Sequence, residues 1–352
     1  MRGDDVTVTI TNWNGKHYLE ECIAAVRAQT VKPREVVLVD NASDDGSVEF
    51  VGARFPDVRI VRLDRNDGPC PARNAGLAAA RTPWVLSIDN DAILAPDCLE
   101  RLMPEAGPDV AIVQPRALFA QDPSRVHYDG ADMHFVGMMT LHHFYAPVAL
   151  ADPAVRDIDA CIAVALLMDK EKIEAIGAYD PAHFILFEDH DLSYRVRSAG
   201  YRIVRVPEAI VLHKEGTAGI SFRKARTYPG RRVFLHSRNR WIVVLKCHGW
   251  RAILLGLPAL ALYDAAYLFF AFKNRSLGDF FRGKWDLMKR LPEILRERRK
   301  VQRRRRVPDR VLLKALPLTI SPLIERRGAV AKLQDGMDVF FRLWWNLVGW
   351  MT

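Results

Sequence analysis

The sequence has little cysteine and no cysteine pattern. Its five cysteines are widely spaced and show neither a C-x-x-C pair nor the Cys and His grouping that a zinc site needs. An odd number of dispersed thiols also does not suit a disulfide framework. We therefore expect reduced, mostly buried thiols in a cytosolic compartment at all five positions, which are Cys22, Cys70, Cys98, Cys161 and Cys247.

Repeats, low-complexity tracts and an apolar leader are also missing. Met1 is soon followed by the acidic pair Asp4 and Asp5 and then by a strand-like run, so we expect no export of the chain. With 49% hydrophobic and 26% charged residues, the 352-residue chain can bury the core of one large domain or two ordinary ones. This composition excludes disordered, collagen-like and disulfide-stabilised small proteins.

Most of the chain has no surplus of positive charge, because the surplus lies in one segment. The net charge is +9, and residues 281–310 contain thirteen Lys or Arg against four Asp or Glu, which accounts for the whole surplus. Such a segment suits a nucleic acid, an anionic lipid surface or a solvated helix face. Whether the flanking segments are apolar or polar distinguishes these alternatives.

Strand-like and helix-like stretches alternate through the first ninety residues. Strands are predicted over residues 6–13, 35–41, 58–63 and 84–91, and helices over 16–29, after 44 and over 72–81. This rhythm predicts an α/β fold with a mostly parallel sheet and crossover helices. Ligands of such sheets bind at the carboxyl ends of the strands, where Asn12, Asp40 and Asp89 fall.

The pattern beyond residue 110 is less regular. We interpret His127, His134, His142 and His143 as loop residues, because no predicted element holds them at metal-ligand spacing. The remaining predicted elements are a buried strand over 161–168, a helix over 170–176, a helix that opens at Glu188, and two short strands over 201–206 and 209–212.

An acidic triplet closes one of the predicted strands. Asp89 and Asp91 are separated by Asn90 and directly follow the apolar run that ends at Ile88. Two carboxylates placed in this way can share a divalent cation that bridges a diphosphate. The alternative is a pair of solvated surface acids, because such triplets are common by chance.

Two further polar motifs follow strands. Residues 43–47 are typical of a capped helix start, with Ser43 or Asp44 at the N-cap. Asp40 is not needed for that cap, and its carboxylate can accept the N3–H of a uracil-like base. Residues 66–76 predict a turn and a proline-initiated helix, on which Arg73 is either solvated or faces a nucleotide.

Seven motifs, in this order, resemble the family 2 glycosyltransferases, which are inverting enzymes with the GT-A fold. They extend over about the first 240 residues and comprise Thr11 to Asn14, Asp40 to Ser47, Asn66 to Gly76, Asp89 to Asp91, Gly177 to Asp180, Glu188 to Leu192 with Arg195, Gly200 and Tyr201, and Pro207 to His213. The resemblance includes bacterial rhamnosyl- and galactosyltransferases. It implies a GT-A catalytic domain over residues 1–245.

The resemblance also implies roles for individual residues. Contacts to a UDP- or dTDP-sugar are expected at Thr11, Asn12, Asp40, Arg73, Asp89 and Asn90. Mn²⁺ or Mg²⁺ is expected on Asp91 and His213, although a lone histidine at a strand end is more often structural. Asp189 is expected to be the general base, and acceptor contacts are expected at Glu188, Asp191 and Trp13.

The chemistry of the transfer explains why a carboxylate is required. An incoming hydroxyl has a pKa far above 7 and must lose its proton as it attacks the sugar. Acids at 188, 189 and 191 also favour a helix N-terminus, which is the structural alternative. Residues 237–241 lack the Gln of the processive pattern Gln-x-x-Arg-Trp, so we expect transfer of a single sugar to a lipid-linked or cell-surface glycan.

One apolar run is long enough to cross a bilayer. Residues 252–272 contain Asp264 as their single charge, and 21 residues at about 1.5 Å each can span the hydrocarbon layer. An aspartate near the middle costs about 2.5–3.5 kcal/mol. Because nucleotide sugars are cytosolic, a single span would also place the basic segment outside, against the positive-inside rule.

We therefore expect residues 246–352 to form a helical region that associates with the anionic inner leaflet, as a monotopic or peripheral element at the cytoplasmic face. A single span is the less favoured arrangement. Two other classes stay open, an inactive GT-A-like membrane scaffold and a basic-tail nucleic-acid-binding protein. The acids and His213 argue against the first, and the lack of an aromatic-rich RNA-binding signature argues against the second.

Overall fold

The computed structural model describes residues 2–214, 228–319 and 328–352. The chain forms two units, of which the first comprises Met1–Ala131, Leu141–Val196 and Tyr201–Glu215. The second comprises Asp132–Thr140, Arg197–Gly200 and Gly216–Thr352. The catalytic domain predicted over residues 1–245 and the membrane-associating region predicted over 246–352 stay predictions.

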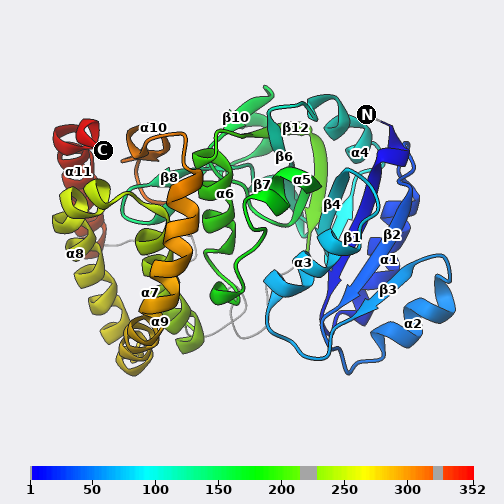
Figure 1. The fold of residues 1–352 in the computed structure, drawn as a ribbon, viewed down its shortest axis with the longest axis horizontal. Coiled ribbons are helices and arrows are strands. Elements are labelled where there is room, and N and C mark those ends of the chain that lie inside the picture. Colours follow the sequence, from blue (N-terminus) through cyan, green and yellow to red (C-terminus); the bar gives the residue numbers. More distant parts are fainter. Residues whose placement is uncertain (1, 215–227, 320–327) are drawn as a thin grey trace. The chain divides into compact units, whose positions relative to one another are not determined.

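A mixed ten-stranded sheet forms the centre of the first unit (Figure 1). Its strands are β1 (Val6–Asn12), β2 (Glu35–Asp40), β3 (Arg59–Arg62), β4 (Trp84–Asp89), β5 (Ala92–Leu94), β6 (Val110–Phe119), β7 (Asp122–Tyr128), β10 (Arg156–Ile158), β11 (Ala165–Asp169) and β12 (Arg202–His213). The order is β10-β12-β6-β11-β4-β1-β2-β3, with β5 on β12 and β7 on β6. The predicted parallel pairing holds for β1 to β4, whereas β11 runs antiparallel between β4 and β6.

Strand β12 corrects one prediction. The two short strands expected over 201–206 and 209–212 are a single strand, paired in parallel with β6. Its register shifts between Val206 and Ile210, around Pro207, which cannot donate a ladder hydrogen bond. The proline therefore interrupts the pairing without ending the strand, and β12 continues to His213.

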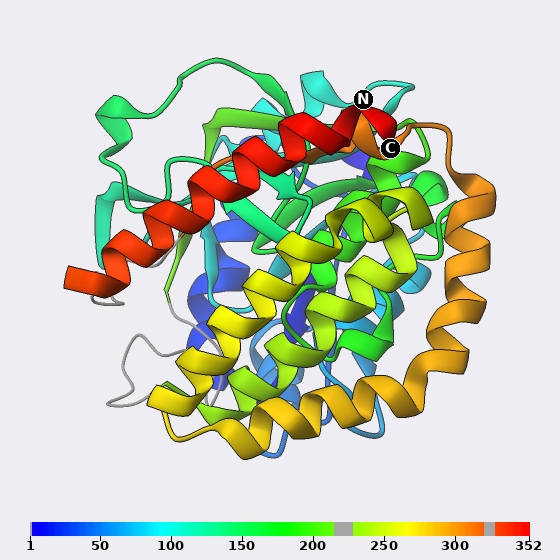
Figure 2. The same ribbon diagram turned by 90° about the vertical axis from the view of Figure 1, so that its left-hand side faces the viewer.

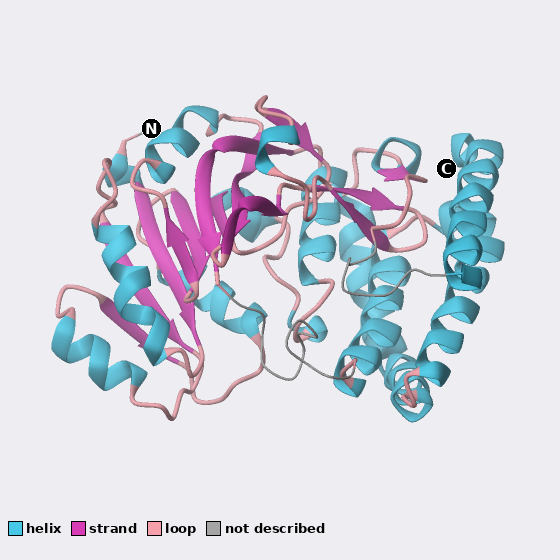
Figure 3. Cartoon of the chain, turned by 180° about the vertical axis from the view of Figure 1, so that it is seen from behind, coloured by secondary structure: helices cyan, strands magenta, loops and turns pink. Residues whose placement is uncertain are grey.

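Helices lie on both faces of the sheet, as Figure 3 shows for the first unit. Their bounds are η1 (Gly3–Asp5), α1 (Lys16–Arg27), α2 (Ser47–Arg54), α3 (Pro69–Ala79), α4 (Cys98–Leu102), η2 (Met103–Glu105), η3 (Val148–Leu150), α5 (Lys170–Ala175), η4 (Pro181–His183) and α6 (Glu188–Ser198). Ile10 of β1 and Leu38 of β2 pack with Ile23 of α1 in the main core. Val37 of β2 faces the other way and packs with Ala72 of α3. The two-residue period of the strands thus separates the two apolar layers.

Helix α3 lies very close to the sheet. A Cβ atom added at Gly76 would lie 3.1 Å from the Cβ of Thr9 on β1. Gly68, just before α3, has a φ of 92°, and a Cβ there would lie 2.5 Å from the carbonyl oxygen of Phe184. Glycine is therefore required at position 68, whereas a Cβ at position 76 would fit only if Thr9 moved slightly. These contacts hold α3 against the middle of β1 and hold the residue before α3 against the loop that contains Phe184.

The structure contradicts the loop interpretation for two of the four histidines. His127 lies on β7 and His134 on β8 (Ala131–His134), and both side chains are buried. His142 and His143 do lie in the loop that follows β9 (Met138–Leu141). The five cysteines are buried and free, as predicted.

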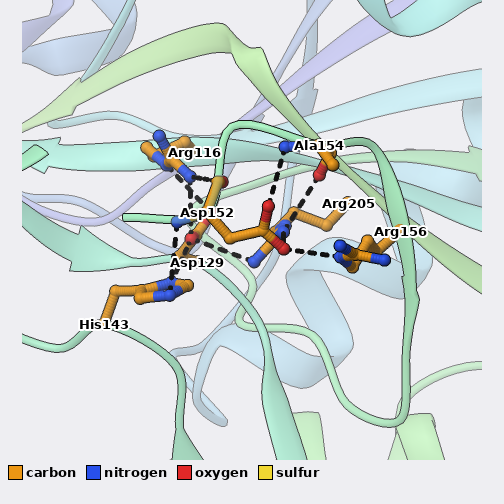
Figure 4. A network of polar contacts seen from close by, with 7 residues as sticks. All are labelled: Arg116, Asp129, His143, Asp152, Ala154, Arg156 and Arg205. Atoms are coloured by element: carbon orange, nitrogen blue, oxygen red, sulfur yellow. Dashed lines mark hydrogen bonds and ion pairs between the residues drawn. The ribbon is translucent and has the colours of Figure 1, made fainter. Parts of the chain in front are cut away.

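A buried charge network joins β6, β12 and the loop that contains His143 (Figure 4). Arg116 donates from Nε and Nη2 to the two oxygens of Asp129, each at 3.0 Å. Arg205 Nη1 lies 3.2 Å from Asp129 Oδ2, and His143 Nδ1 lies 2.7 Å from the same oxygen. The Asp129 side chain is fully buried. Asp129 therefore pairs with two buried guanidinium groups, and Asp152, whose Oδ2 lies 3.0 Å from Arg205 Nη2, supplies the second negative charge at this edge of the sheet.

The second unit is mainly helical (Figure 2). Its elements are β8, β9, α7 (Gly230–Cys247), α8 (Trp250–Lys273), α9 (Leu277–Arg304), α10 (Asp309–Leu312), β13 (Leu313–Lys314), α11 (Gly328–Val348) and η5 (Gly349–Met351). Strand β8 pairs with β9 and β13 in a small sheet. Helix α9 contains Pro292 and is bent in Figure 2, as the loss of a helix hydrogen bond at proline explains.

Asp264 joins three helices of the second unit. Arg240 Nη2 and Trp241 Nε1 of α7 lie 2.6 and 2.7 Å from its two oxygens. Lys284 Nζ of α9 lies 2.9 Å from Oδ2. The one charge within the apolar stretch of α8 is therefore turned toward α7 and α9.

Asp129 supplies a test of the buried charge network. Replacing it by Asn leaves the buried Arg116 without its carboxylate partner, whereas Arg205 keeps Asp152. Loss of one partner of a buried pair costs about 3–5 kcal/mol. We expect Asp129→Asn to lower the free energy of unfolding in urea by this amount. Asp122→Asn, at an exposed position on β7, is the control and should leave the urea midpoint unchanged. Equal midpoints for the two variants would contradict the assignment.

Candidate active site

Four residues predicted to contact a nucleotide form one polar network at the carboxyl end of β1. The parallel register places Asn12 opposite Asp40, and Asn12 Nδ2 donates to Asp40 Oδ2 at 2.9 Å. Asn90 Nδ2 donates to Asn12 Oδ1 at 2.7 Å, and the Asn90 backbone N–H donates to the carbonyl of Thr11 at 3.2 Å. The ends of β1, β2 and β4 therefore meet in one place, as the sequence predicted.

Ser43 has a different role from the predicted helix cap. Its backbone N–H donates to Asp40 Oδ1 at 2.9 Å, and its hydroxyl accepts from the Asn14 backbone N–H at 2.9 Å. Helix α2 begins later, at Ser47 after Gly46, so neither Ser43 nor Asp44 is its N-cap. Residues 40–46 instead form a loop that fixes the carboxylate of Asp40.

Asp89, Asp91 and His213 form a compact cluster, although 122 residues separate the last two. Strand β5, which starts at Ala92, pairs with the end of β12 and sets Ala92 opposite His213. His213 Nε2 consequently lies 3.4 Å from Asp91 Oδ2. One ligand atom from each of the three side chains lies within 4.8 Å of the others.

The donor set of this cluster fits a divalent cation. Carboxylate oxygens suit Mn²⁺ and Mg²⁺, and a neutral imidazole is a common further ligand. Asp89 is already paired with Arg73 at 2.9 Å, whereas Asp91 and His213 face each other. The main chain also fixes the site, because the Lys214 N–H donates to the carbonyl of Asp91 at 3.1 Å.

Arg73 connects the cluster to the acidic pair of α6. Its Nη2 donates to Asp89 Oδ1 at 2.9 Å and to the carbonyl of Ala163 at 3.0 Å. Its Nη1 lies 3.5 Å from Glu188 Oε1. The Arg73 side chain is buried and lies over the ring of Tyr179. Its contacts are therefore with acids of the site, and the expected contact with a nucleobase stays a prediction.

Glu188 and Asp189 begin α6, where the side chain of Glu188 is buried and that of Asp189 is half-buried. Asp189 Oδ2 accepts from the Ala163 backbone N–H at 3.2 Å. Among the described residues, Asp189 Oδ1 is buried without a hydrogen-bond partner. Burial raises the pKa of Glu188 to about 8, and the charge of Asp189 adds to the effect. Burial raises the pKa of Asp189 to about 6, while Arg73 acts in the opposite direction.

Asp191 and Trp13 occupy contrasting positions. Asp191 is fully buried, and its Oδ2 lies 2.7 Å from Arg195 Nη2. His183 Nε2 lies 3.6 Å from the other oxygen of Asp191, within a second acidic group that includes Asp180. Trp13, by contrast, is 44% exposed. The expected acceptor contacts of Asp191 and Trp13 stay predictions, and in this structure the Asp191 carboxylate is engaged with Arg195.

Two features of the site have no signal in the sequence. The bridge made by Arg73 depends on where α3, β4 and α6 meet. His127 lies against His213 because β7 pairs with β6, which in turn pairs with β12. Arg73 and His127 are both far in sequence from the residues they contact, so no sequence motif predicts these contacts.

Two family models and several curated relatives match this chain. The profile described as glycosyl transferase family group 2 matches residues 84–285, which is more than half of the chain, and that of glycosyl transferase family 2 matches residues 7–147. The N-acetylglucosaminyl-diphospho-decaprenol L-rhamnosyltransferase of Mycobacterium tuberculosis is 26% identical over 275 residues, 70% of this chain and 86% of the relative. The succinoglycan biosynthesis protein ExoO of Rhizobium meliloti is 40% identical over 104 residues, 29% of this chain and 30% of that relative, so this match spans less than a third of its length.

Solved structures show the same fold at low sequence identity. GalNAc-T7 with UDP, GalNAc and Mn²⁺ has a TM-score of 0.51 and 17% identity, covering 68% of this chain and 50% of its own. The mannosyltransferase PcManGT of Pyrobaculum calidifontis, with GDP-Man and Mn²⁺, has a TM-score of 0.50 and 19% identity, covering 86% of each chain. These likenesses confirm the expected GT-A fold. From its fold and its family profiles, the chain belongs to glycosyl transferase family group 2 and is a glycosyltransferase.

Proposed function

We propose that this enzyme transfers a single sugar, with inversion, from a UDP- or dTDP-sugar to a lipid-linked or cell-surface glycan, using Mn²⁺ or Mg²⁺. The observation that carries the proposal is the environment of Asp189. One oxygen is fixed by the Ala163 N–H, and the other is buried without a hydrogen-bond partner among the described residues. A carboxylate with one oxygen that makes no hydrogen bond is suited to take a proton from an incoming hydroxyl.

The donor end of the reaction is assigned to the network at β1, β2 and β4. Asp40 is held by Asn12 and by the Ser43 N–H and accepts the imide N–H of the pyrimidine base. Asp91 and His213 would hold the cation, with Asp89 beside it. When bound, such a cation stabilises the negative charge that develops on the departing nucleoside diphosphate.

The acceptor end is assigned to the acidic pair of α6. At neutral pH the raised pKa of Glu188 keeps a proton on that carboxyl, which can donate to an acceptor hydroxyl. Asp189, with the lower pKa of the two, accepts the proton of the attacking hydroxyl. Arg73 keeps these acids and Asp89 in one charge-balanced group. The name of the mycobacterial relative, a transferase to a lipid-linked sugar, supports an acceptor of this class.

An apolar stripe on α8 supports membrane association. Helix α8 has a mean hydropathy of 1.8 in its most apolar window, yet only 22% of that window is buried. Exposed apolar residues recur along one side of the helix at three- and four-residue spacing, so they form a continuous face. They are Trp250, Leu254, Leu257, Pro258, Ala261, Ala265, Phe269 and Phe272. A face this long without polar residues suits lipid as its partner.

The ion pairs of Asp264 favour a helix that lies in the membrane surface over one that crosses the bilayer. Asp264 is on the packed side of α8, bound to Arg240 and Lys284. A span would have to break these pairs or take Arg240 and Lys284 into hydrocarbon with it, and both are costly. With the helix lying flat, the polar cluster stays on the protein side while the apolar stripe enters the leaflet.

Helix α9 supplies a matching charge pattern. Its first half exposes Phe281, Trp285 and Met288, whereas its second half exposes a run of basic side chains. These are Arg296, Arg299, Lys300, Arg303 and Arg304. Each basic residue near an anionic surface contributes about 1 kcal/mol to binding. The inner leaflet of the cell membrane is therefore the partner that we assign to this region.

Asp189→Asn tests the proposed reaction. The amide keeps the size of the side chain but cannot take the proton, so transfer should fall by about 10²–10⁴-fold. Binding of UDP in the presence of Mn²⁺, measured by calorimetry, should remain within error of wild type. Asp57→Asn, at an exposed position far along the sequence from α6, is the matched control. Undiminished turnover in the Asp189 variant would remove this residue from the role of base.

The pH profile gives an independent check. Asp189 acts in its ionised form, and its raised pKa means that the proton is retained up to about pH 6. We expect kcat/KM to fall about tenfold for each pH unit below this value. An unperturbed aspartate would keep its activity to about pH 4. A flat profile between pH 6 and 4.5, with the enzyme still folded by circular dichroism, would contradict the assignment.

Liposome flotation tests the membrane partner. The full chain should float with vesicles that contain phosphatidylglycerol, and the double variant Leu254→Glu and Phe269→Glu should stay in the bottom fraction. The control is Leu150→Glu, which changes a leucine that is 77% exposed in the first unit. Flotation of the double variant at the wild-type level would exclude the α8 stripe. A shift of labelled RNA or DNA at the same salt, without flotation, would favour the nucleic-acid alternative.

A further inference from the structure

His213 uses both of its ring nitrogens within the site. Its Nε2 lies 3.4 Å from Asp91 Oδ2, on the side where the cation is assigned. Its Nδ1 lies 3.0 Å from Nδ1 of His127, and this contact is buried. The two imidazoles are nearly parallel, with ring centroids 4.8 Å apart and an angle of 17° between the planes.

We propose that His127 is a positioning residue for the cation site, an inference that rests on the proposed role of His213. His127 accepts the Nδ1–H of His213, which fixes the ring and leaves the lone pair of Nε2 directed at Asp91. The contact of His127 with the cation site is with the ring of His213, so we place its effect in the orientation of that ring. No motif in the sequence assigns it a role.

The protonation of the imidazoles gives the chemical reason. A histidine binds a metal ion as the neutral ring, through the nitrogen that carries no proton. If Nε2 of His213 is the ligand atom, the one ring proton is on Nδ1 and needs an acceptor. Ligand histidines regularly donate this second N–H to a fixed neighbour, and loss of that neighbour weakens metal binding. Nδ1 of His127 is that acceptor when His127 is neutral and carries its own proton on Nε2.

The surroundings of His127 hold it rigidly in this position. Its side chain is fully buried on β7. Its ring stacks against Phe119 at 4.2 Å and against Tyr128 at 3.9 Å between centroids. Phe119 is also the residue opposite His213 in the pairing of β6 with β12. The sheet therefore fixes both rings, and the hydrogen bond sets the rotation of His213 about its side-chain bonds.

Two substitutions separate the hydrogen bond from simple packing. His127→Phe keeps a flat ring between Phe119 and Tyr128 but removes the acceptor. His127→Asn loses the ring, but its amide oxygen can take the place of Nδ1 as acceptor. The positioning role and a packing role therefore predict opposite rankings of the two variants.

The measurement is the dissociation constant of Mn²⁺ by electron paramagnetic resonance, with and without UDP, together with the melting temperature. We expect His127→Phe to raise the dissociation constant about 10–100-fold at a nearly unchanged melting temperature. His127→Asn should stay within about threefold of wild type, although it lowers the melting temperature because packing is lost. The reverse ranking, with Phe tolerated and Asn impaired in Mn²⁺ binding, would overturn the proposal.

Nitrogen-15 spectra of the wild-type histidines give a second readout that needs no variant. On addition of Mg²⁺ and UDP, the proton of His127 should be on Nε2 and its Nδ1 should show the shift of an acceptor. A proton on Nδ1 of His127 in the loaded enzyme would contradict the proposal. If the wild type binds no Mn²⁺ with UDP present, the proposed cation site fails. If wild type and His127→Phe both bind Mn²⁺ with the same affinity, the cation site stands and only the positioning role of His127 is excluded.

Discussion

The buried guanidinium of Arg73 is the interaction on which the rest of the site depends. A charge removed from water must be paired, and Arg73 is paired with Asp89 on one side and lies near Glu188 on the other. These acids come from β4 and α6, and Arg73 comes from α3. The guanidinium group of Arg73 therefore fixes the relative positions of three elements that carry the assigned donor and acceptor residues. It also offsets the charge of the adjacent acids Glu188 and Asp189, of which the charge of Asp189 helps burial to raise the pKa of Glu188.

The chemistry assigned to the enzyme follows from this charge balance. In the proposal, Asp91 and His213 would hold the cation at one end of the group with Asp89 beside it, and Asp189 provides a carboxylate with a raised pKa at the other end. Burial produces the raised pKa values, since it disfavours ionised carboxyls. Because its pKa lies just below neutrality, Asp189 is ionised at neutral pH and also basic enough to accept a proton.

Periodic patterns in the sequence were sufficient for the alternating strands and helices of the first ninety residues and for the polar network at their ends. The pair Asp91 and His213 was expected from the resemblance of the motif order to a known family, and the structure sets the two side chains 3.4 Å apart, while their role as metal ligands stays a prediction. The sequence could not reveal that β12 continues through Pro207, because a proline normally ends a strand pattern. It could not place His127 or Asp129 either, because the neighbours of both are set by strand pairing across the sheet. The arrangement of α8 could not be predicted from the sequence. An apolar run with one aspartate is compatible both with a transmembrane helix and with a surface helix, and only the ion pairs of Asp264 favour one of them.

The most direct test of the account is a crystal structure of the enzyme grown with UDP and Mn²⁺, with diffraction recorded at the manganese absorption edge. The account predicts one strong anomalous peak within coordination distance of Asp91 and His213, next to the diphosphate, with the uracil ring against Asp40. An anomalous peak at any other place, or a nucleotide bound away from the ends of β1 and β4, would contradict it.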